Sequence, residues 1–438
     1  MKHCILWLFA ALSIFSACFP GKRIDKQARA DLFRPKGLEN ALIGVQVFDA
    51  NSGLVLYGHQ DENYFVPASN TKLFSLYAGL KYLGDSIVGM RYMETDSGIL
   101  VLPSGDPTLL HRDYAWQPVI DFLKRKNLPV YISDAHWKEE GLGPGWSWDD
   151  YNDDYMVERS PMPVYGNIIQ WNQQQQPDQS FSSYSIPDIN WKVDFADSTG
   201  KHFFVKRNFS DNSFMITEGT EKFRQQDVPF VTGGLQATLD LLKDTVGKRI
   251  FITHTWPAPD KNATRTIYSR PVDSLYRPMM FRSDNFFAEQ TLLMSGNERL
   301  GIMNDAAMID TLLSTDLAGL PQRPEWVDGS GLSRYNLFSP ADFVWILNKM
   351  KNEFGLERMK RILPTGGSGT LGSYYKQDSG RIFAKTGSLS GVICLSGYLL
   401  TERNRLLIFS VLANNYPGRG PVLRRAVAQF VDYLLSNY

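Results

Sequence analysis

The chain has 438 residues, 43% of them hydrophobic, which is enough for two or three domains with packed cores. Its 46 lysine and arginine residues balance 46 aspartate and glutamate residues, so no excess charge attracts nucleic acid or an anionic membrane surface. We therefore expect no nucleic-acid partner.

The amino terminus has the pattern of a secretory signal peptide, which we assign to residues 1–18. Residues 1–3 include a basic lysine, and residues 4–15 form an apolar stretch shorter than the ~20 residues of a membrane span. The sequence Phe-Ser-Ala-Cys at residues 15–18 is similar to a bacterial lipoprotein box in which Cys18 carries the lipid. We expect an exported protein, with Cys18 as a candidate lipid anchor and no other attachment to the membrane.

Cysteine usage agrees with export. Of the three cysteines, Cys4 and Cys18 lie in the leader and Cys394 lies in the apolar run 391–395. The folded part therefore has no pair of cysteines to oxidise, and we interpret Cys394 as a small buried residue.

A hairpin and a helix are predicted next, after a polar linker around Gly21 to Gln27. Residues 42–49 and 54–57 have strand character on either side of a turn at 50–53. The helix follows Pro67 and ends near Gly84, because apolar residues recur on one face. These residues are Leu73, Leu76, Tyr77, Leu80 and Leu83.

Ser69 and Lys72 are placed in the first turn of this helix, three residues apart and therefore on one surface. Free backbone N–H groups and the positive end of the helix dipole favour developing negative charge there. A serine in this position can be a nucleophile whose proton the lysine takes. The alternative is a helix cap followed by a solvated lysine, and the rest of the chain decides between the two interpretations.

We predict a separate inserted domain, mostly β, over residues 95–261. Pro, Gly, Trp and Asp cluster at 141–150, and four glutamines follow one another at 173–176. Strand-like pieces at 129–132 and 202–205 and a helix near 116–126 lie among long irregular segments.

Regular periodicity resumes at Pro271, and the flanking segments 25–94 and 262–438 are predicted to form one domain. With the opening hairpin, the later strands suggest an antiparallel sheet covered by helices on both faces, which is an α+β fold. The predicted helices are 272–294, 341–350 and 426–435, and the predicted strands are 381–385, 391–400 and 406–413.

Two further triplets support the chemical interpretation of Ser69. Ser283-Asp284-Asn285 lies in a helical segment, and Lys385-Thr386-Gly387 closes a predicted strand and is followed by Ser388. Ser-x-x-Lys, Ser-Asp-Asn and Lys-Thr-Gly, in this order, are the signatures of active-site-serine penicillin-binding and β-lactamase enzymes. Each motif is common alone, but their order and placement make chance a poor explanation.

The resemblance can be narrowed to one family among these enzymes. Together with them, several segments resemble the class C, type-4 penicillin-binding proteins, a family of serine-type D-alanyl-D-alanine carboxypeptidases and endopeptidases. The resemblance implies a penicillin-binding fold with domains inserted between its first two motifs, a periplasmic location, peptidoglycan stem peptides as substrates and β-lactams as inhibitors. The segments are 67–72, 104–109, 282–289, 328–334 and 369–371.

The resemblance also implies a role for each motif residue. Ser69 would be the nucleophile and Lys72 its base, which requires burial and a neighbouring cation such as Lys385 to lower a lysine pKa that is normally ~10.4. Ser283 would pass the proton toward the leaving group. Asn285 would bind the substrate amide and help to hold Lys72.

The strand motif is expected to hold the other end of the substrate. Lys385 and Thr386 would bind its terminal carboxylate, and Gly387 would let the acyl group approach the strand edge. The backbone N–H groups of Ser69 and Ser388 would form the oxyanion hole.

Two other functions are weighed against the peptidase. A class A β-lactamase needs a Glu-x-x-Leu-Asn loop between the second and third motifs, and no such run occurs between Asn285 and Lys385. A catalytically silent penicillin-binding lipoprotein is the other alternative, which the intact motifs disfavour. Ser330, between two glycines and without an adjacent base, is interpreted as a loop residue, and the scattered histidines predict neither a metal site nor a cofactor.

Overall fold

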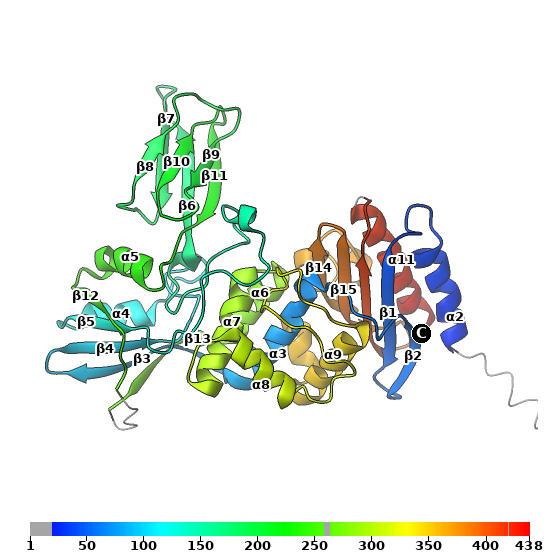
Figure 1. Cartoon of the computed structure of the whole chain (residues 1–438). Coiled ribbons are helices and arrows are strands. Elements are labelled where there is room, and N and C mark those ends of the chain that lie inside the picture. Colours follow the sequence, from blue (N-terminus) through cyan, green and yellow to red (C-terminus); the bar gives the residue numbers. More distant parts are fainter. Residues whose placement is uncertain (1–19, 258–262, 419) are drawn as a thin grey trace, which may run out of the picture.

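The computed structural model describes residues 20–257, 263–418 and 420–438 (Figure 1). The predicted leader at 1–18, with Cys18, lies outside the described residues. The described strands form two five-stranded and two three-stranded sheets. Among the described helices, none has the length and apolar character needed to cross a membrane.

The first five-stranded sheet joins the two ends of the chain. Its strand order is β14-β15-β16-β1-β2, and every neighbouring pair is antiparallel, so the predicted antiparallel sheet is confirmed. The strands are β1 (Leu42–Asp49), β2 (Leu54–His59), β14 (Ile382–Leu389), β15 (Val392–Leu400) and β16 (Leu406–Asn414).

The edge strand β14 is longer than predicted. Lys385, Thr386, Gly387 and Ser388 all lie inside it and pair with β15, whereas the sequence placed the strand's end at Lys385. Gly387 continues the ladder opposite Cys394 and is a paired strand residue.

One face of this sheet is covered by helices from both chain ends, α2 (Pro20–Ala28) with the π-helical turn η1 (Arg29–Phe33), and α11 (Gly420–Asn437) (Figure 1). The predicted polar linker at Gly21 to Gln27 is therefore wrong. Ile24, Ala28 and Leu32 recur every four residues and are fully buried in the core beneath α11, although most of the residues between them are polar.

The other face packs against a helical layer in which α9 contacts β1, β15 and β16, and α3 contacts α7 and α9. The single helical segment predicted at 272–294 is two helices, because Ser283 has a positive φ of 61° and the Asp284 side chain caps α7. The layer comprises α3 (Lys72–Tyr82), α6 (Asp273–Phe281), α7 (Asn285–Leu300), α8 (Asp305–Ser314), α9 (Pro340–Phe354) and α10 (Leu356–Ile362).

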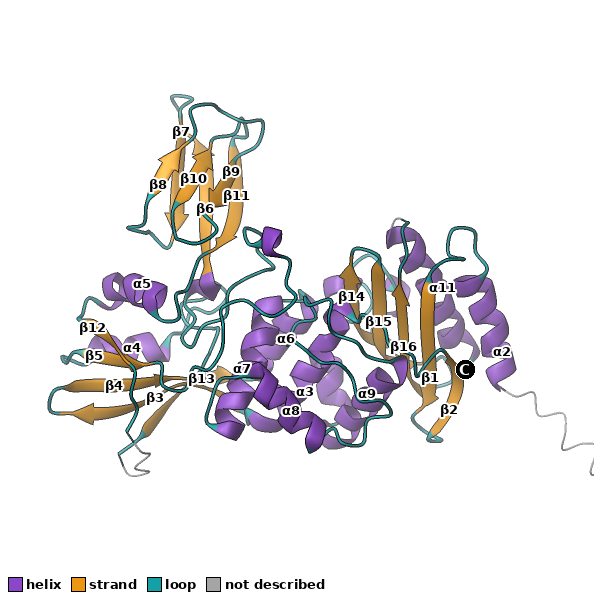
Figure 2. Cartoon of the chain, viewed as in Figure 1, coloured by secondary structure: helices purple, strands orange, loops and turns teal. Residues whose placement is uncertain are grey.

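Between α3 and α6, the chain forms a second five-stranded sheet in the order β12-β5-β4-β3-β13, covered by two helices (Figure 2). The division at 95–261 stays a prediction; β3 and β13, which reach beyond those bounds, pair with one another in this sheet. Its elements are β3 (Ser86–Thr95), β4 (Gly98–Pro103), α4 (Pro118–Arg125), β5 (Val130–Ser133), α5 (Gln236–Val246), β12 (Ile250–Thr253) and β13 (Arg265–Pro271).

The two three-stranded sheets form a small β subdomain that projects from this region at the top of Figure 2. Their orders are β8-β10-β9 and β11-β6-β7. The strands are β6 (Ile168–Gln175), β7 (Phe181–Ile186), β8 (Val193–Phe195), β9 (Phe204–Arg207), β10 (Phe214–Thr217) and β11 (Phe223–Pro229).

The packing of α2 gives a stability prediction. Ile24→Ala removes a fully buried side chain and should lower the free energy of unfolding by about 2–5 kcal/mol. Lys26→Ala, on the exposed side of the same helix, should change it by less than about 0.5 kcal/mol. Chemical denaturation measures both, and equal small effects would mean that residues 20–28 do not pack on the domain.

Candidate active site

Ser69 lies on a 3₁₀ turn, η2 (Ala68–Thr71), immediately before α3 rather than inside its first α-helical turn as predicted. Ala68 has a φ of +47°, and the Thr71 hydroxyl donates a hydrogen bond of 2.9 Å to its carbonyl. The Asn70 amide donates to Ser396 Oγ of β15 at 2.7 Å. The turn is thus fixed both internally and to the sheet.

Lys72, the first residue of α3, is fully buried and directs its amine at three oxygens. Its Nζ lies 3.0 Å from Ser69 Oγ, 2.6 Å from Asn285 Oδ1 and 2.7 Å from the carbonyl oxygen of Ser330. Burial lowers the pKa of Lys72 to about 8, against the opposing charges of Asp328, Glu289 and Asp284. A minor neutral fraction is therefore present at pH 7 and grows as the pH approaches 8, which lets Lys72 act as a general base.

The second motif brings Ser283 and Asn285 to the same place. The break between α6 and α7 sets Ser283 in the left-handed region, and its hydroxyl accepts a hydrogen bond of 2.8 Å from Lys385 Nζ. Asn285, at the start of α7, accepts from Lys72 through Oδ1 and donates through Nδ2 to the Tyr155 carbonyl at 2.9 Å. The second motif is therefore bonded to both of the others, to Lys72 through Asn285 and to Lys385 through Ser283.

Lys385 is the second buried lysine of the site. Its amine donates to Ser283 Oγ and, at 2.7 Å, to the Thr386 carbonyl. Burial and the charge of Lys72 hold the pKa of Lys385 well below its usual value. The sequence predicted that burial and the charge of Lys385 would both lower the pKa of Lys72. Burial does so, whereas the repulsion between the two lysines lowers the pKa of Lys385 instead.

The strand residues lie close to the Ser69 turn. A Cβ at Gly387 would lie 2.7 Å from the Pro67 carbonyl oxygen, so only glycine lets β14 approach this closely. Ser388 lines the same cleft as Ser69, while its hydroxyl accepts a 3.0 Å hydrogen bond from Arg424. Thr386 and Gly387 instead line a neighbouring cavity of about 390 Å³ between β14 and α11.

The cleft above Ser69 has a volume of about 580 Å³. It is lined by residues from the segment between α3 and α6 and by residues from the domain that carries Ser69. Ser283, Asn285 and Ser388 line it together with Ser69. The sequence did not indicate the contribution of the 141–155 segment, which adds polar and aromatic groups, or that of Arg334. The added residues are Gly145, Ser147, Asp150 and Tyr155.

Ser330 contributes to the site through its backbone, a role that its side chain did not suggest. It was predicted to be a loop residue, and its hydroxyl indeed only accepts a local bond from the Leu332 N–H. Its backbone carbonyl, however, is one of the three acceptors of Lys72. Side-chain motifs carry no signal for such a backbone contact.

The model of the D-Ala-D-Ala carboxypeptidase 3 (S13) family matches residues 26–437. The chain belongs to this family. The D-alanyl-D-alanine carboxypeptidase of Actinomadura sp. (strain R39) is 26% identical to this S13 protein, over 92% of this chain and 82% of the relative.

Solved structures show the same fold for this S13 protein. Penicillin binding protein 4 (dacB) of Haemophilus influenzae superimposes with a TM-score of 0.73 at 19% identity, covering 94% of this chain and 99% of that one. The same protein in complex with a novel β-lactam gives a TM-score of 0.69 at 18% identity, with the same coverage. The S13 protein is accordingly an enzyme of the serine-type D-Ala-D-Ala carboxypeptidase class with the predicted α+β penicillin-binding fold.

Metal ligands were not predicted. Within residues 20–257, 263–418 and 420–438, no three His, Cys, Asp or Glu side chains group as metal ligands. The absence of a metal or cofactor stays a prediction.

The contact between Gly331 and the Ser69 turn is testable. Gly331 has a φ of +79°, and a Cβ there would lie 1.9 Å from the Ala68 carbonyl oxygen. Gly301 has a similar φ of +76°, but a Cβ there would meet no neighbouring side chain or loop of the described residues within 4 Å. Gly331→Ala and Gly301→Ala each impose backbone strain of about 1–2 kcal/mol. Gly331→Ala should cost about 1–3 kcal/mol more, because it displaces the turn that carries Ser69.

Denaturation of both variants measures the difference, and acylation by a fluorescent penicillin reports the position of Ser69. Equal stability and equal acylation in the two variants would contradict the described contact.

Proposed function

We propose that this S13 enzyme is a D-alanyl-D-alanine carboxypeptidase and endopeptidase that cleaves peptidoglycan stem peptides through an acyl-enzyme at Ser69. β-Lactams would acylate the same hydroxyl. The observation that carries the proposal is the 3.0 Å contact between Ser69 Oγ and the buried amine of Lys72, whose pKa is lowered to about 8. A hydroxyl beside a partly neutral amine is an activated nucleophile.

In the proposed acylation, Ser69 Oγ attacks the carbonyl carbon between two D-alanines while the neutral Lys72 takes the hydroxyl proton. The tetrahedral intermediate then breaks its C–N bond, and the proton passes by way of Ser283 to the departing amine of the last D-alanine. Water hydrolyses the resulting ester and restores Ser69. Cleavage of a crosslink follows the same steps with a different amine as the leaving group.

Substrate binding is assigned to the remaining motif residues. Lys385 and Thr386 would bind the terminal carboxylate, and Asn285 would bind the peptide amide. Gly387 lets the acyl group lie against the edge of β14. The backbone N–H groups of Ser69 and Ser388 would stabilise the oxyanion, a contribution of typically ~2.7–4 kcal/mol for each donor.

We also propose that the protein works in the periplasm after export by the leader at residues 1–18. Support comes from the apolar stretch at 4–15 and the lipoprotein-like residues 15–18, with Cys18 as the lipid anchor. A cell-wall substrate lies in the same compartment.

The nucleophile is tested by Ser69→Ala. Wild-type protein should become covalently labelled by a fluorescent penicillin and release D-alanine from a muropeptide pentapeptide, and Ser69→Ala should do neither. Ser314→Ala, whose exposed hydroxyl bonds only to its own helix, should behave as the wild type. Labelling of Ser69→Ala would show that another residue is the nucleophile.

Labelling by wild type without D-alanine release would instead identify a silent penicillin binder. Rapid loss of the label with repeated β-lactam hydrolysis would identify a β-lactamase.

The pH dependence tests the base. Because Lys72 must be neutral to accept a proton, the acylation rate should rise with pH up to about 8 and level off above it. Asn285→Asp places a carboxylate against Nζ, which favours the ammonium and should move this acid limb to higher pH. A move of one pH unit lowers the rate at pH 7 about tenfold. An unmoved limb in the variant would exclude Lys72 as the titrating group.

A further inference from the structure

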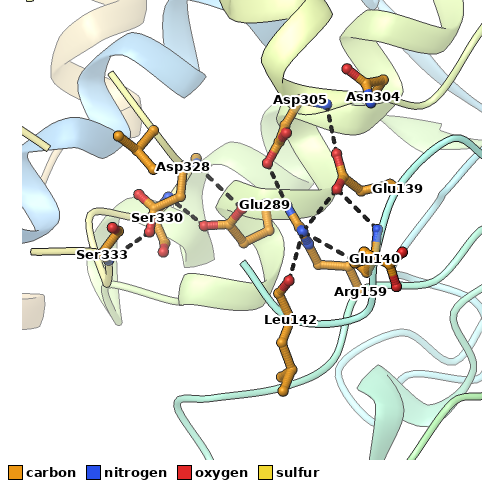
Figure 3. Close-up of polar contacts among 12 residues, drawn as sticks. Glu139, Glu140, Leu142, Arg159, Glu289, Asn304, Asp305, Asp328, Ser330 and Ser333 are labelled. Carbon is orange, nitrogen blue, oxygen red and sulfur yellow. Dashed lines mark hydrogen bonds and ion pairs between the residues drawn. The ribbon is translucent and has the colours of Figure 1, made fainter. Parts of the chain in front are cut away.

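A buried charged cluster lies beside the site, around a side chain that the mechanism does not use. Arg159, which belongs to the segment between α3 and α6, is fully buried. Its guanidinium lies 2.5 Å from Asp305 Oδ2, 3.2 Å from Glu139 Oε1 and 3.7 Å from Glu289 Oε2 (Figure 3). It also donates to the carbonyls of Glu140 and Leu142.

Glu289 connects this cluster to Lys72. One carboxylate oxygen accepts the Ser330 N–H at 2.7 Å and the other accepts the Gly329 N–H at 3.2 Å. The carbonyl of the same Ser330 accepts the Lys72 amine at 2.7 Å. Glu289 also lies one turn after Asn285 on α7, so the helix that carries it supplies a second acceptor of Lys72.

The loop that carries Ser330 is also hydrogen-bonded to the inserted segment. Asp328 accepts the backbone N–H groups of Gly331 and Ser333 at 2.8 and 2.6 Å, which closes the loop on itself. It also accepts the Trp146 indole N–H at 3.0 Å. The Arg159 guanidinium lies 5.6 Å from the centre of the Trp146 ring, so one part of the inserted segment holds both Asp328 and Glu289.

We propose that Glu289, fixed by Arg159, is a positioning residue for Lys72. It holds the Ser330 carbonyl that directs the lysine amine toward Ser69. The inference rests on the proposed function, in which Lys72 is the base and Ser69 the nucleophile. It also gives the inserted segment a part in the chemistry, since Arg159 comes from that segment.

The charge of Glu289 acts on Lys72 as well. Burial and the charge of Asp328 raise the pKa of Glu289 to about 8, while Arg159 opposes this rise. An ionised Glu289 in turn raises the pKa of Lys72. The charged groups that act on Glu289 are Lys72 on α3, Asp305 on α8, Asp328 in the loop and Arg159 in the inserted segment. Arg159 is itself paired with Glu139 and Asp305.

Two substitutions separate position from charge. Glu289→Gln keeps the size of the side chain, loses one N–H acceptor and removes the charge that Glu289 gains as the pH rises through its pKa of about 8. The acylation rate above the acid limb should fall at least tenfold, and the limb should move to lower pH. Glu289→Asp keeps the charge but shortens the reach, so its plateau should fall while its limb stays at the wild-type pH.

Glu298→Gln is the matched control. It lies on the same α7 and pairs with an arginine, Arg91, at 2.7 Å, but it is partly exposed and does not contact the Ser330 loop. It should keep the wild-type plateau and limb.

The measurement is the rate of labelling of the full chain by a fluorescent penicillin from pH 6 to pH 10, normalised to the fraction that labels at saturation. The inference would be overturned if Glu289→Gln and Glu289→Asp had the acylation rate of the wild type and an acid limb at the wild-type pH. It would also be overturned if a smaller folded fraction accounted for the whole loss of acylation rate. If the wild type itself is not labelled at its serine, the proposed function fails and the inference fails with it. Labelled wild type beside unaffected Glu289 variants overturns the inference alone.

Discussion

The structure depends on keeping an amine out of water. The three hydrogens of a protonated Lys72 meet three acceptors, a hydroxyl, a side-chain amide oxygen and a backbone carbonyl. Burial nevertheless lowers the pKa from 10.5 to about 8, so the native state carries a cost of roughly 3 kcal/mol below that pH, which fades as the pH rises toward the unfolded value. The surrounding fold has to offset this cost, and the same desolvation gives the lysine its basic character at moderate pH.

The three acceptors of that amine come from distant parts of the chain. The hydroxyl precedes α3, the amide begins α7, and the carbonyl belongs to the loop around residue 330. Each is fixed by backbone features that a side-chain view overlooks: the positive φ of Ala68, the break at Ser283 and the glycine at 331. Two strained positions and a glycine in the left-handed region surround one buried amine, as is common where a site must be held rigid.

The sequence predicted the residues of the site better than the contacts and backbone features that hold them in place. Ser69, Lys72, Ser283, Asn285 and Lys385 could be found because their motifs combine residue type, spacing and order, and the sheet could be found because its strands are continuous apolar runs. The helix at 20–28 was missed because its buried residues recur every four positions among charged ones. The break at Ser283 was missed because apolar periodicity continues across it. The contact of Arg159 with Glu289 joins residues far apart in the chain, and neither belongs to a local pattern.

The pairing of β1 with β16 has a consequence for the order in which the protein folds. Strand β1 is synthesised more than 350 residues before its partner β16 and has to wait for it. The intervening region, with sheets of its own, can fold meanwhile and shorten the loop whose closure entropy opposes that pairing. A chain cut before Leu406 would lack the strand that both β1 and β15 require, so the site between the two parts of this sheet and its helices can assemble only after β16 has been made.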